Sequence, residues 1–205
     1  VTFLNDRKSG SLDRLVVLSS GGCVYTENTE SYSENSDARG ANDYGRLKLR
    51  LEKRALEFFG ETIICRIANV YGPGQRPGQG QGVISNWFQS AALNEPVKLF
   101  GDGTEFRDFI FISDAASAVG QLISHEASGI YNIGSGIPTS LNRIIELIGE
   151  SLSTKIEVVK LPRRHFDRIG YFLNIDKIRV GTSWTPKISI EEGVNLTRNY
   201  LKNIN

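Results

Sequence analysis

The sequence predicts an α/β protein built on a parallel sheet, and three observations lead to this fold class. A short apolar run at 15–18 ends in two serines and two glycines, which is typical of a buried strand that enters a loop. A helical pattern follows at 44–59, and a second apolar run occupies 62–67. Strand, helix and strand in this order favour a crossover between neighbouring parallel strands.

The segments around the first predicted helix are also distinctive. Its apolar residues Leu47, Leu51, Ala55 and Phe58 form one stripe, and Gly60 would end the helix. The polar stretch at 26–43 before it predicts a long surface loop. After the second strand, residues 72–82 are rich in Gly, Pro and Gln, which favours irregular structure.

The rest of the chain continues the alternation of helices and strands. Further strands are expected at 97–100, 106–112, 129–133 and 155–159, with a tight turn at 101–103. Further helices are expected near 85–93, at 114–124, at 141–152 and from 190 to the C-terminal region. Ser113, Ser140 and Ser189 stand where hydroxyl groups cap the starts of helices, and Ser189 opens a capping-box pattern.

Composition and charge exclude several classes of function. The net charge of +1 and the lack of a basic run provide no field that would attract nucleic acid or a membrane surface. Cys23 and Cys65 have no metal-ligand spacing, so we expect no metal site. The two lone cysteines, together with the lack of a signal peptide or a membrane-spanning stretch, indicate the cytoplasm. Because the chain has no methionine and opens at Val1 in mid-pattern, we expect an N-terminal portion to be missing.

Tyr44 and Lys48 are the first candidate catalytic residues. They stand at i and i+4 on the predicted helix and share one face, so the ammonium can lie beside the phenol. A neighbouring cation favours the phenolate form of a tyrosine and so makes it a usable base. The spacing alone also fits an exposed surface pair, and the surrounding motifs must decide between the two.

Six segments of the chain carry motifs in a recognisable order. They are 18–25 (LSSGGCVY), Tyr44-xxx-Lys48, 66–75 (RIANVYGPGQ), 100–108 (FGDG followed by RD), 131–136 (YNIGSG) and 164–167 (RHFD). Together they resemble the extended short-chain dehydrogenase/reductase superfamily, specifically its NAD-dependent nucleotide-sugar epimerases and dehydratases. The resemblance covers essentially the whole chain.

The resemblance implies the C-terminal part of a Rossmann-type doubly wound parallel sheet plus a small mixed α/β substrate-binding subdomain. Residues 1–72 would be a remnant of the NAD-binding domain. Residues 73–205 would form mainly the nucleotide-sugar subdomain, with segments around 107–135 returning to the Rossmann sheet. Family members hold the NAD pyrophosphate on a Gly-rich turn at a helix N-terminus, and the glycines at 72–82 lack that context. Most of the NAD site is therefore expected in the missing portion.

The same resemblance assigns roles around the dyad. Tyr44 would be the acid/base at a sugar hydroxyl, and Lys48 would bind the nicotinamide ribose and activate the tyrosine. Ser19 and Ala68 would also contact the cofactor. The third catalytic hydroxyl of the family falls on Gly21 here, and Ser20 is the nearest hydroxyl. Ser20 would either take that role after a shift of the loop or simply cap the end of the strand.

Further residues are assigned to the substrate by the resemblance. They are Asn69, Asn86, Trp87, Phe100, Arg107, Arg164, Asp167 and Tyr171. Phe100 offers a stacking face, the two arginines suit diphosphate oxygens, and Asp167 would accept hydrogen bonds from ribose hydroxyls. Two alternatives stay open: Arg107 could pair with Asp108, and Arg164 could be one solvated member of a basic cluster.

The implied function is an NAD-dependent epimerase that moves a hydride and a proton at C4 of a UDP-hexose. Dehydratases of the family carry an acidic group just before the Val-Tyr pair, where this chain has Gly22 and Cys23, so dehydration is disfavoured. A nucleotide-sugar reductase is an alternative, as is an inactive truncated remnant that at most binds a sugar nucleotide. The full-length enzyme is expected to be a homodimer formed through the Tyr44 helix and to serve polysaccharide biosynthesis.

Overall fold

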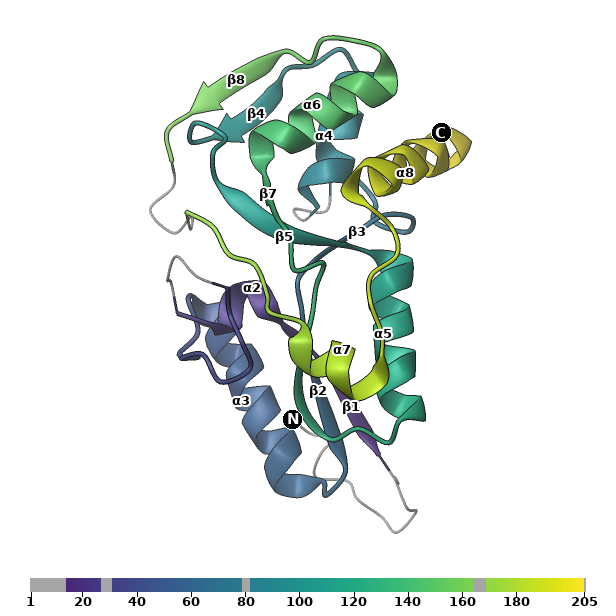
Figure 1. The fold of residues 1–205 in the computed structure, drawn as a ribbon. Helices are drawn as coiled ribbons and strands as arrows, with labels where there is room; N and C mark the ends of the chain where they lie inside the picture. Colours follow the sequence, from purple (N-terminus) through teal and green to yellow (C-terminus); the bar gives the residue numbers. More distant parts are fainter. Residues whose placement is uncertain (1–13, 27–30, 79–81, 164–168, 205) are drawn as a thin grey trace.

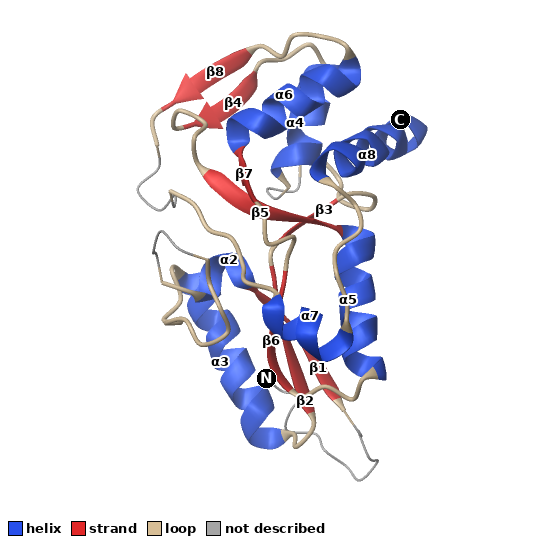
Figure 2. Cartoon of the chain, in the orientation of Figure 1, coloured by secondary structure: helices blue, strands red, loops and turns tan. Residues whose placement is uncertain are grey.

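Strands β1 (Leu15–Ser20) and β2 (Thr62–Ile67) lie side by side, and helix α3 (Asp43–Phe58) lies between them in the sequence (Figure 1). The structure is a computed structural model that describes residues 14–26, 31–78, 82–163 and 169–204. β2 also pairs in parallel with β6 (Gly129–Ile133), which gives the all-parallel order β1-β2-β6. Helix α3 covers one side of these strands and α5 (Ile112–Ser124) covers the other (Figure 2). The α/β architecture with a parallel sheet is confirmed.

A second group of elements lies above this sheet in Figure 1. Its strands are β3 (Asn69–Tyr71), β4 (Val97–Phe100), β5 (Phe106–Phe111), β7 (Pro138–Ser140) and β8 (Val158–Leu161). Its helices are α4 (Val83–Ala92), α6 (Leu141–Leu152) and α8 (Ile190–Ile204). β5 pairs in parallel with β3 and antiparallel with β7, and β4 pairs in parallel with β8. The short helix α2 (Gly21–Val24) packs against α3, and the short helix α7 (Asp176–Thr182) packs against β6.

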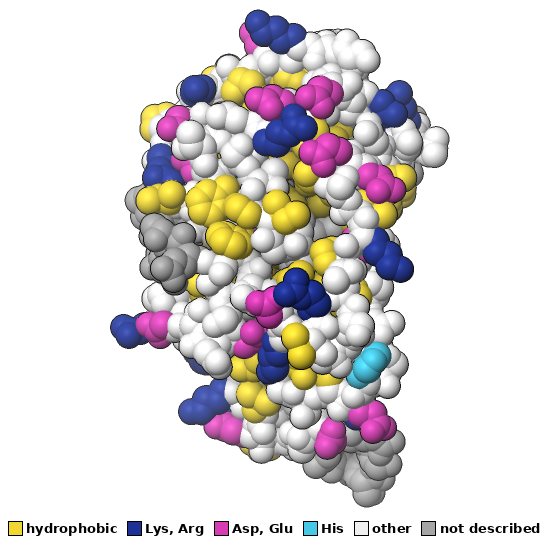
Figure 3. Space-filling model, viewed as in Figure 1, with side chains coloured by type: hydrophobic (Ala, Val, Ile, Leu, Met, Phe, Trp, Pro, Cys, Tyr) yellow, Lys and Arg dark blue, Asp and Glu magenta, His cyan; other side chains and the backbone are white. Residues whose placement is uncertain are grey.

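Two apolar cores hold these groups together. One lies around the parallel sheet and contains fully buried residues such as Ile63, Leu122 and Ile133. The other lies between α4, α6 and α8, around Leu99 and Ile144. The described residues contain no helix that combines the length and the apolar character needed to cross a membrane. On the face shown in Figure 3, Lys and Arg side chains are interspersed with Asp and Glu.

Two of the buried surfaces expected from the sequence are partly exposed. β1 pairs with β2 alone among the described strands, and Leu18 is 55% exposed. The apolar stripe of α3 is also not its packing face, because Leu47 and Phe58 are each 46% exposed. Of the stripe, α3 buries Ala55 alone, and its other buried residues are Gly45 and Glu52. The helix thus packs through small and polar residues whose partners come from β1, β2 and α2.

The stretch at 26–43 is not simply a surface loop. Tyr32 is fully buried, its ring stacks on Tyr25 with centroids 4.8 Å apart, and its backbone N–H donates to the Phe172 carbonyl at 2.9 Å. The predicted Ser113 cap is wrong, because α5 begins at Ile112 and no side chain caps it. The hydroxyls of Ser140 and Ser189 do cap α6 and α8, each accepting a backbone N–H at 3.1 Å.

Candidate functional site

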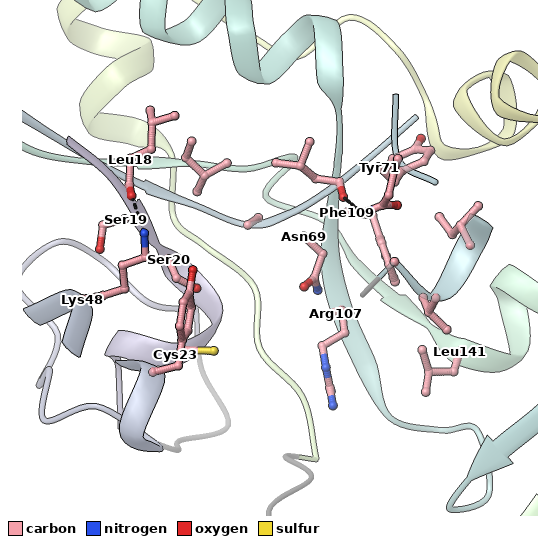
Figure 4. Close-up of a pocket in the computed structure, with 18 residues that line it drawn as sticks. Leu18, Ser19, Ser20, Cys23, Lys48, Asn69, Tyr71, Arg107, Phe109 and Leu141 are labelled. Atoms are coloured by element: carbon pink, nitrogen blue, oxygen red, sulfur yellow. Dashed lines mark hydrogen bonds between the residues drawn. The ribbon is translucent and has the colours of Figure 1, made fainter. Parts of the chain in front are cut away.

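A cavity of about 620 Å³ opens where β1 and β2 end and α3 begins (Figure 4). Its lining comes from β1, α2, α3, β2–β3, α4, β5 and the first residue of α6. Seven of the predicted site residues line this cavity: Ser19, Ser20, Tyr44, Lys48, Ala68, Asn69 and Arg107. The carboxyl ends of parallel strands are where α/β sheets usually bind ligands. Two cations, Lys48 and Arg107, and no carboxylate are found in the described lining, so the cavity favours an anionic ligand.

Tyr44 and Lys48 lie in the first two turns of α3, on the wall formed with β1. The helix starts here because the Asn42 side chain caps it, accepting the N–H of Gly45 at 2.9 Å. The Lys48 ammonium donates to the Leu18 carbonyl at 2.9 Å and lies 5.4 Å from the centroid of the Tyr44 ring. Tyr44 itself is 48% exposed, so its ring stands at the mouth of the cavity. The two side chains are thus held together as the helical spacing predicted.

The two serines of β1 have different surroundings. The Ser19 hydroxyl is buried and donates to the Glu52 carboxylate of α3. The Ser20 hydroxyl lines the cavity and makes no hydrogen bond within the described part of the chain. Side chains that alternate along a strand point to opposite faces, which explains the difference. Ser20 is therefore the β1 hydroxyl that is available to a ligand.

Gly21 has a physical reason to lack a side chain. A Cβ built on Gly21 would lie 2.6 Å from Leu173 Cδ1 and 3.3 Å from the Arg66 carbonyl oxygen. The neighbouring Gly22 is covered in the same way, because its Cβ would lie 2.5 Å from the Tyr171 hydroxyl. The hydroxyl that the family pattern puts at position 21 is thus replaced by a packing contact with the segment around Leu173.

Asn69 and Arg107 line the opposite side of the cavity from Lys48 (Figure 4). The alternative in which Arg107 pairs with Asp108 does not describe the structure, because other groups bind the fully buried Asp108 carboxylate. It accepts the backbone N–H groups of Ser135 at 2.7 Å, Gly136 at 3.1 Å and Leu173 at 3.2 Å. Burial raises the pKa of Asp108, and these hydrogen bonds oppose the shift. Asp108 therefore holds the loop after β6, and Arg107 on the same strand lines the cavity.

A second cavity of about 430 Å³ adjoins the first. It is lined by the predicted residues Asn86, Trp87, Phe100 and Arg107, and by Lys98 and Glu105. The two cavities share Gly82, Val83, Arg107 and Leu141 as lining residues. Arg107 thus lies at the border between them, where it can reach a ligand that extends through both.

One predicted substrate residue of the described part of the chain, Tyr171, lines neither cavity. Tyr171 is 4% exposed and packs in the core around the parallel sheet, with its hydroxyl over Gly22. Arg164 and Asp167 lie outside the described residues. Their roles stay predictions from the family pattern.

Sequence reasoning missed a buried ion pair directly behind the dyad. Glu52 lies on α3 one turn after Lys48, and it accepts hydrogen bonds from Arg66 of β2. The side chains of both are about 95% buried, with relative exposures of 4% and 5%. The i, i+4, i+8 spacing of Tyr44, Lys48 and Glu52 was the available signal, since such residues share one helix face.

Comparisons with known proteins agree with this geometry. Residues 5–134 match the family described as the NAD dependent epimerase/dehydratase family. A putative UDP-glucose 4-epimerase of Methanocaldococcus jannaschii is 31% identical over 212 residues, which is 100% of this chain and 68% of the relative. A dTDP-4-dehydro-6-deoxyglucose reductase of Escherichia coli is 30% identical over 200 residues, which is 95% of this chain and 63% of the relative.

Among solved structures, the UDP-glucose 4-epimerase of Thermotoga maritima with UDP-glucose has a TM-score of 0.85 and 30% sequence identity. That match covers 93% of this chain and 64% of the Thermotoga chain. The chain thus spans 63–68% of the length of these relatives. By the extent of the family match and the similarity to these relatives, the chain belongs to the NAD-dependent epimerase/dehydratase family.

Proposed function

We propose that this chain carries the catalytic dyad and the sugar-nucleotide site of an NAD-dependent epimerase that acts at C4 of a UDP-hexose. One observation supports this most strongly. Tyr44 and Lys48 face Asn69 and Arg107 across one cavity, and Arg107 leads into a second cavity with an aromatic lining. A sugar in the first cavity, a diphosphate at Arg107 and a base in the second would fit this arrangement.

In this proposal Tyr44 takes the proton of the sugar hydroxyl and later returns it. Lys48 orients the phenol from its position on the Leu18 carbonyl, and Ser20 offers its free hydroxyl to the reacting oxygen. Asn69 would hold the sugar from the opposite wall. The chemistry that NAD would supply when bound is reversible hydride transfer at the same carbon.

The diphosphate would be held at the border of the two cavities, and the base would be held in the second cavity. Arg107 presents a guanidinium that suits phosphate oxygens, and Arg164 is proposed to assist it. Asn86 and Trp87 lie early in α4, and Phe100 ends β4, so all three can flank the base. Asp167 keeps its proposed contact with the ribose.

The residues present suit the nicotinamide end of NAD. Tyr44, Lys48 and Ala68 line the first cavity, together with Ser19, although the Ser19 hydroxyl is already bound by Glu52. The sequence lacks the Gly-rich strand–turn–helix that holds a dinucleotide pyrophosphate. We therefore propose that most of the NAD site belongs to parts of the relatives that this chain does not span. A cytoplasmic location and a role in polysaccharide precursor synthesis belong to the same proposal.

Calorimetric titration tests the binding part of the proposal. We expect weak binding of UDP and no measurable binding of NAD+. Arg107→Gln should weaken UDP binding at least about tenfold, since it removes a charged hydrogen-bond donor. Arg179→Gln, in the exposed Arg179–Asp176 pair of α7, is the matched control and should leave it unchanged. No binding of UDP would overturn the sugar-nucleotide site, and tight binding of NAD+ would overturn the proposed location of the cofactor site.

A nucleotide-sugar reductase is the second candidate, favoured by the similarity to the Escherichia coli reductase. A reductase consumes one reduced cofactor for each product, whereas an epimerase regenerates its own. Incubation of the full-length enzyme with UDP-glucose and without added NADPH separates the two, because only an epimerase turns over. A third candidate is an inactive remnant that at most binds a sugar nucleotide, for which no turnover would follow.

A further inference from the structure

A single buried carboxylate ties the dyad helix to two strands. Along one face of α3, exposure falls from Tyr44, which is 48% exposed, through the half-buried Lys48 to Glu52, which is 3% exposed. The Glu52 carboxylate accepts from the Ser19 hydroxyl of β1. It also accepts from Arg66 of β2, at 3.2 Å from Nε to each oxygen and 2.7 Å from Nη2. One side chain of α3 is thus bonded to both strands at their carboxyl ends.

Successive residues of β1 hold successive turns of α3. The Leu18 carbonyl accepts from Lys48, and the next residue, Ser19, donates to Glu52, one helical turn further along. Two attachment points on one helix face fix both the rotation of the helix and its position along its own axis. A shift of α3 by even a fraction of a turn would take the Lys48 ammonium away from the Leu18 carbonyl.

The ion pair is poorly suited to stabilising the fold. Both side chains are almost completely buried, and the desolvation of such pairs often cancels their attraction. The Nη1 atom of Arg66 is also buried and has no hydrogen-bond partner within the described residues, which adds a further cost. Apolar residues of similar size usually serve stability equally well. The geometry of the pair is therefore a better explanation for its presence than its contribution to stability.

We propose that Glu52 and Arg66 are positioning residues for the Tyr44–Lys48 dyad, and this inference rests on the proposed function of that dyad. The carboxylate bridges β1 and β2 and sets α3 so that Lys48 reaches the Leu18 carbonyl. Neither residue lines the cavity, so both would act through residues that do, namely Ser19 and Lys48. A merely structural role would be satisfied by any pair that fills the same volume.

The double variant Glu52→Met/Arg66→Leu separates the two roles. It replaces the ion pair by apolar side chains of similar volume. Relief of the buried charges favours the variant, whereas loss of the acceptor of Ser19 and of the contact between Arg66 and the Tyr25 ring opposes it, so the thermal midpoint should stay close to that of the unmodified chain. The position of α3 is read from the NMR signal of the Lys48 ammonium in protein labelled with nitrogen-15 lysine. The signal is assigned to Lys48 because it disappears in Lys48→Arg. We expect a protected ammonium signal in the unmodified chain. In the double variant, its hydrogen exchange should be at least about tenfold faster.

Two further variants keep the test decisive. Ser19→Ala retains the ion pair and removes the link to β1, so it should also speed the exchange at Lys48 even if the double variant fails to fold. Glu57→Gln, on the same helix, breaks only the exposed pair with Lys53 and should leave the Lys48 signal unchanged. The proposal is overturned if Lys48 shows no protected signal, or if the folded double variant or Ser19→Ala keeps its protection. The readout requires neither UDP nor NAD+, so it is independent of the titrations that test the proposed function.

Discussion

The carbonyl oxygen of Cys23 occupies the space in which Gly45 would carry a Cβ. Gly45 lies in the first turn of α3, and α2 rests on that turn with no room for a methyl group between them. The same carbonyl also accepts the N–H of Ala41 at 2.8 Å. Helix α2, which carries Cys23, is thus fixed beside the turn of α3 that carries Tyr44, through a close contact between two backbones.

This contact reverses the usual effect of a glycine in a helix. Replacing a helical glycine by alanine normally stabilises a protein by about 0.5–1 kcal/mol. We expect Gly45→Ala to destabilise the chain by about 1–3 kcal/mol in urea unfolding, because the methyl group must displace backbone rather than a flexible side chain. Gly120→Ala in α5 is the matched control, since nothing lies within 4 Å of its Cβ. It should be stabilising, and equal effects of the two variants would contradict the argument.

The contact between Gly21 and Leu173 can be measured in the same way. Gly21→Ser restores the hydroxyl of the family pattern but presses on Leu173, which is fully buried. We expect a loss of about 1–3 kcal/mol in the free energy of unfolding. In the background of Leu173→Ala, which opens space, the same serine should cost at least about 0.5 kcal/mol less. Strict additivity of the two changes would show that the side chains do not compete for this space.

Local pattern and tertiary packing contributed differently to what the sequence could predict. The pairing of Tyr44 with Lys48 depends on helical spacing alone and was predictable, as were β2 and the Ser140 cap. The role of Glu52 depends on Arg66 and Ser19, which come from two other strands, and no local pattern brings them together. The α3 stripe was misjudged for the same reason. An apolar stripe is normally the packing face of a helix, but here only Ala55 of the stripe is buried. Glu52 faces the strands instead, and Gly45 packs against α2.

The two cysteines should react very differently with alkylating reagents. Cys65 is fully buried in β2, and burial raises the pKa of its thiol to about 12, so the reactive thiolate is essentially absent near neutral pH. Cys23 is half-buried and points into the first cavity (Figure 4). Iodoacetamide at about pH 8 should therefore label Cys23 alone, as read by peptide mass mapping.

The same reaction reports on the occupancy of the cavity. If UDP-glucose binds as proposed, it should slow the labelling of Cys23. In the control, protein unfolded in guanidinium should be labelled at both cysteines whether or not UDP-glucose is present. Labelling of Cys65 at the rate of Cys23 in the folded chain would contradict the burial of β2.

The exposed stripe of α3 allows a test of the homodimer that the family resemblance predicts. Leu47, Leu51 and Phe58 share one helix face, and the first and last are nearly half exposed. If this face forms the dimer, Leu47→Glu in the full-length enzyme should shift the sedimentation coefficient from that of a dimer to that of a monomer. Val180→Glu in α7 is the control, since Val180 is 84% exposed and lies on another helix. A dimer that survives Leu47→Glu would exclude this face.

Glu191 should make the stability of the upper group of elements depend on pH. The Glu191 carboxylate accepts a hydrogen bond from its own backbone N–H in the first turn of α8, and this is the main reason that its pKa is lowered. The Arg143 guanidinium, whose Nη2 lies 3.3 Å from the carboxylate, lowers the pKa further. A carboxyl group whose pKa is lowered by folding stabilises the native state above its unfolded pKa, and that stabilisation is lost as the pH falls through the folded pKa. The thermal midpoint of Glu191→Gln should therefore lie below that of the unmodified chain near pH 7. The difference should shrink as the pH falls below about 4. Glu157→Gln, at an exposed position, should show no such convergence, and a constant difference between Glu191→Gln and the unmodified chain would refute the linkage.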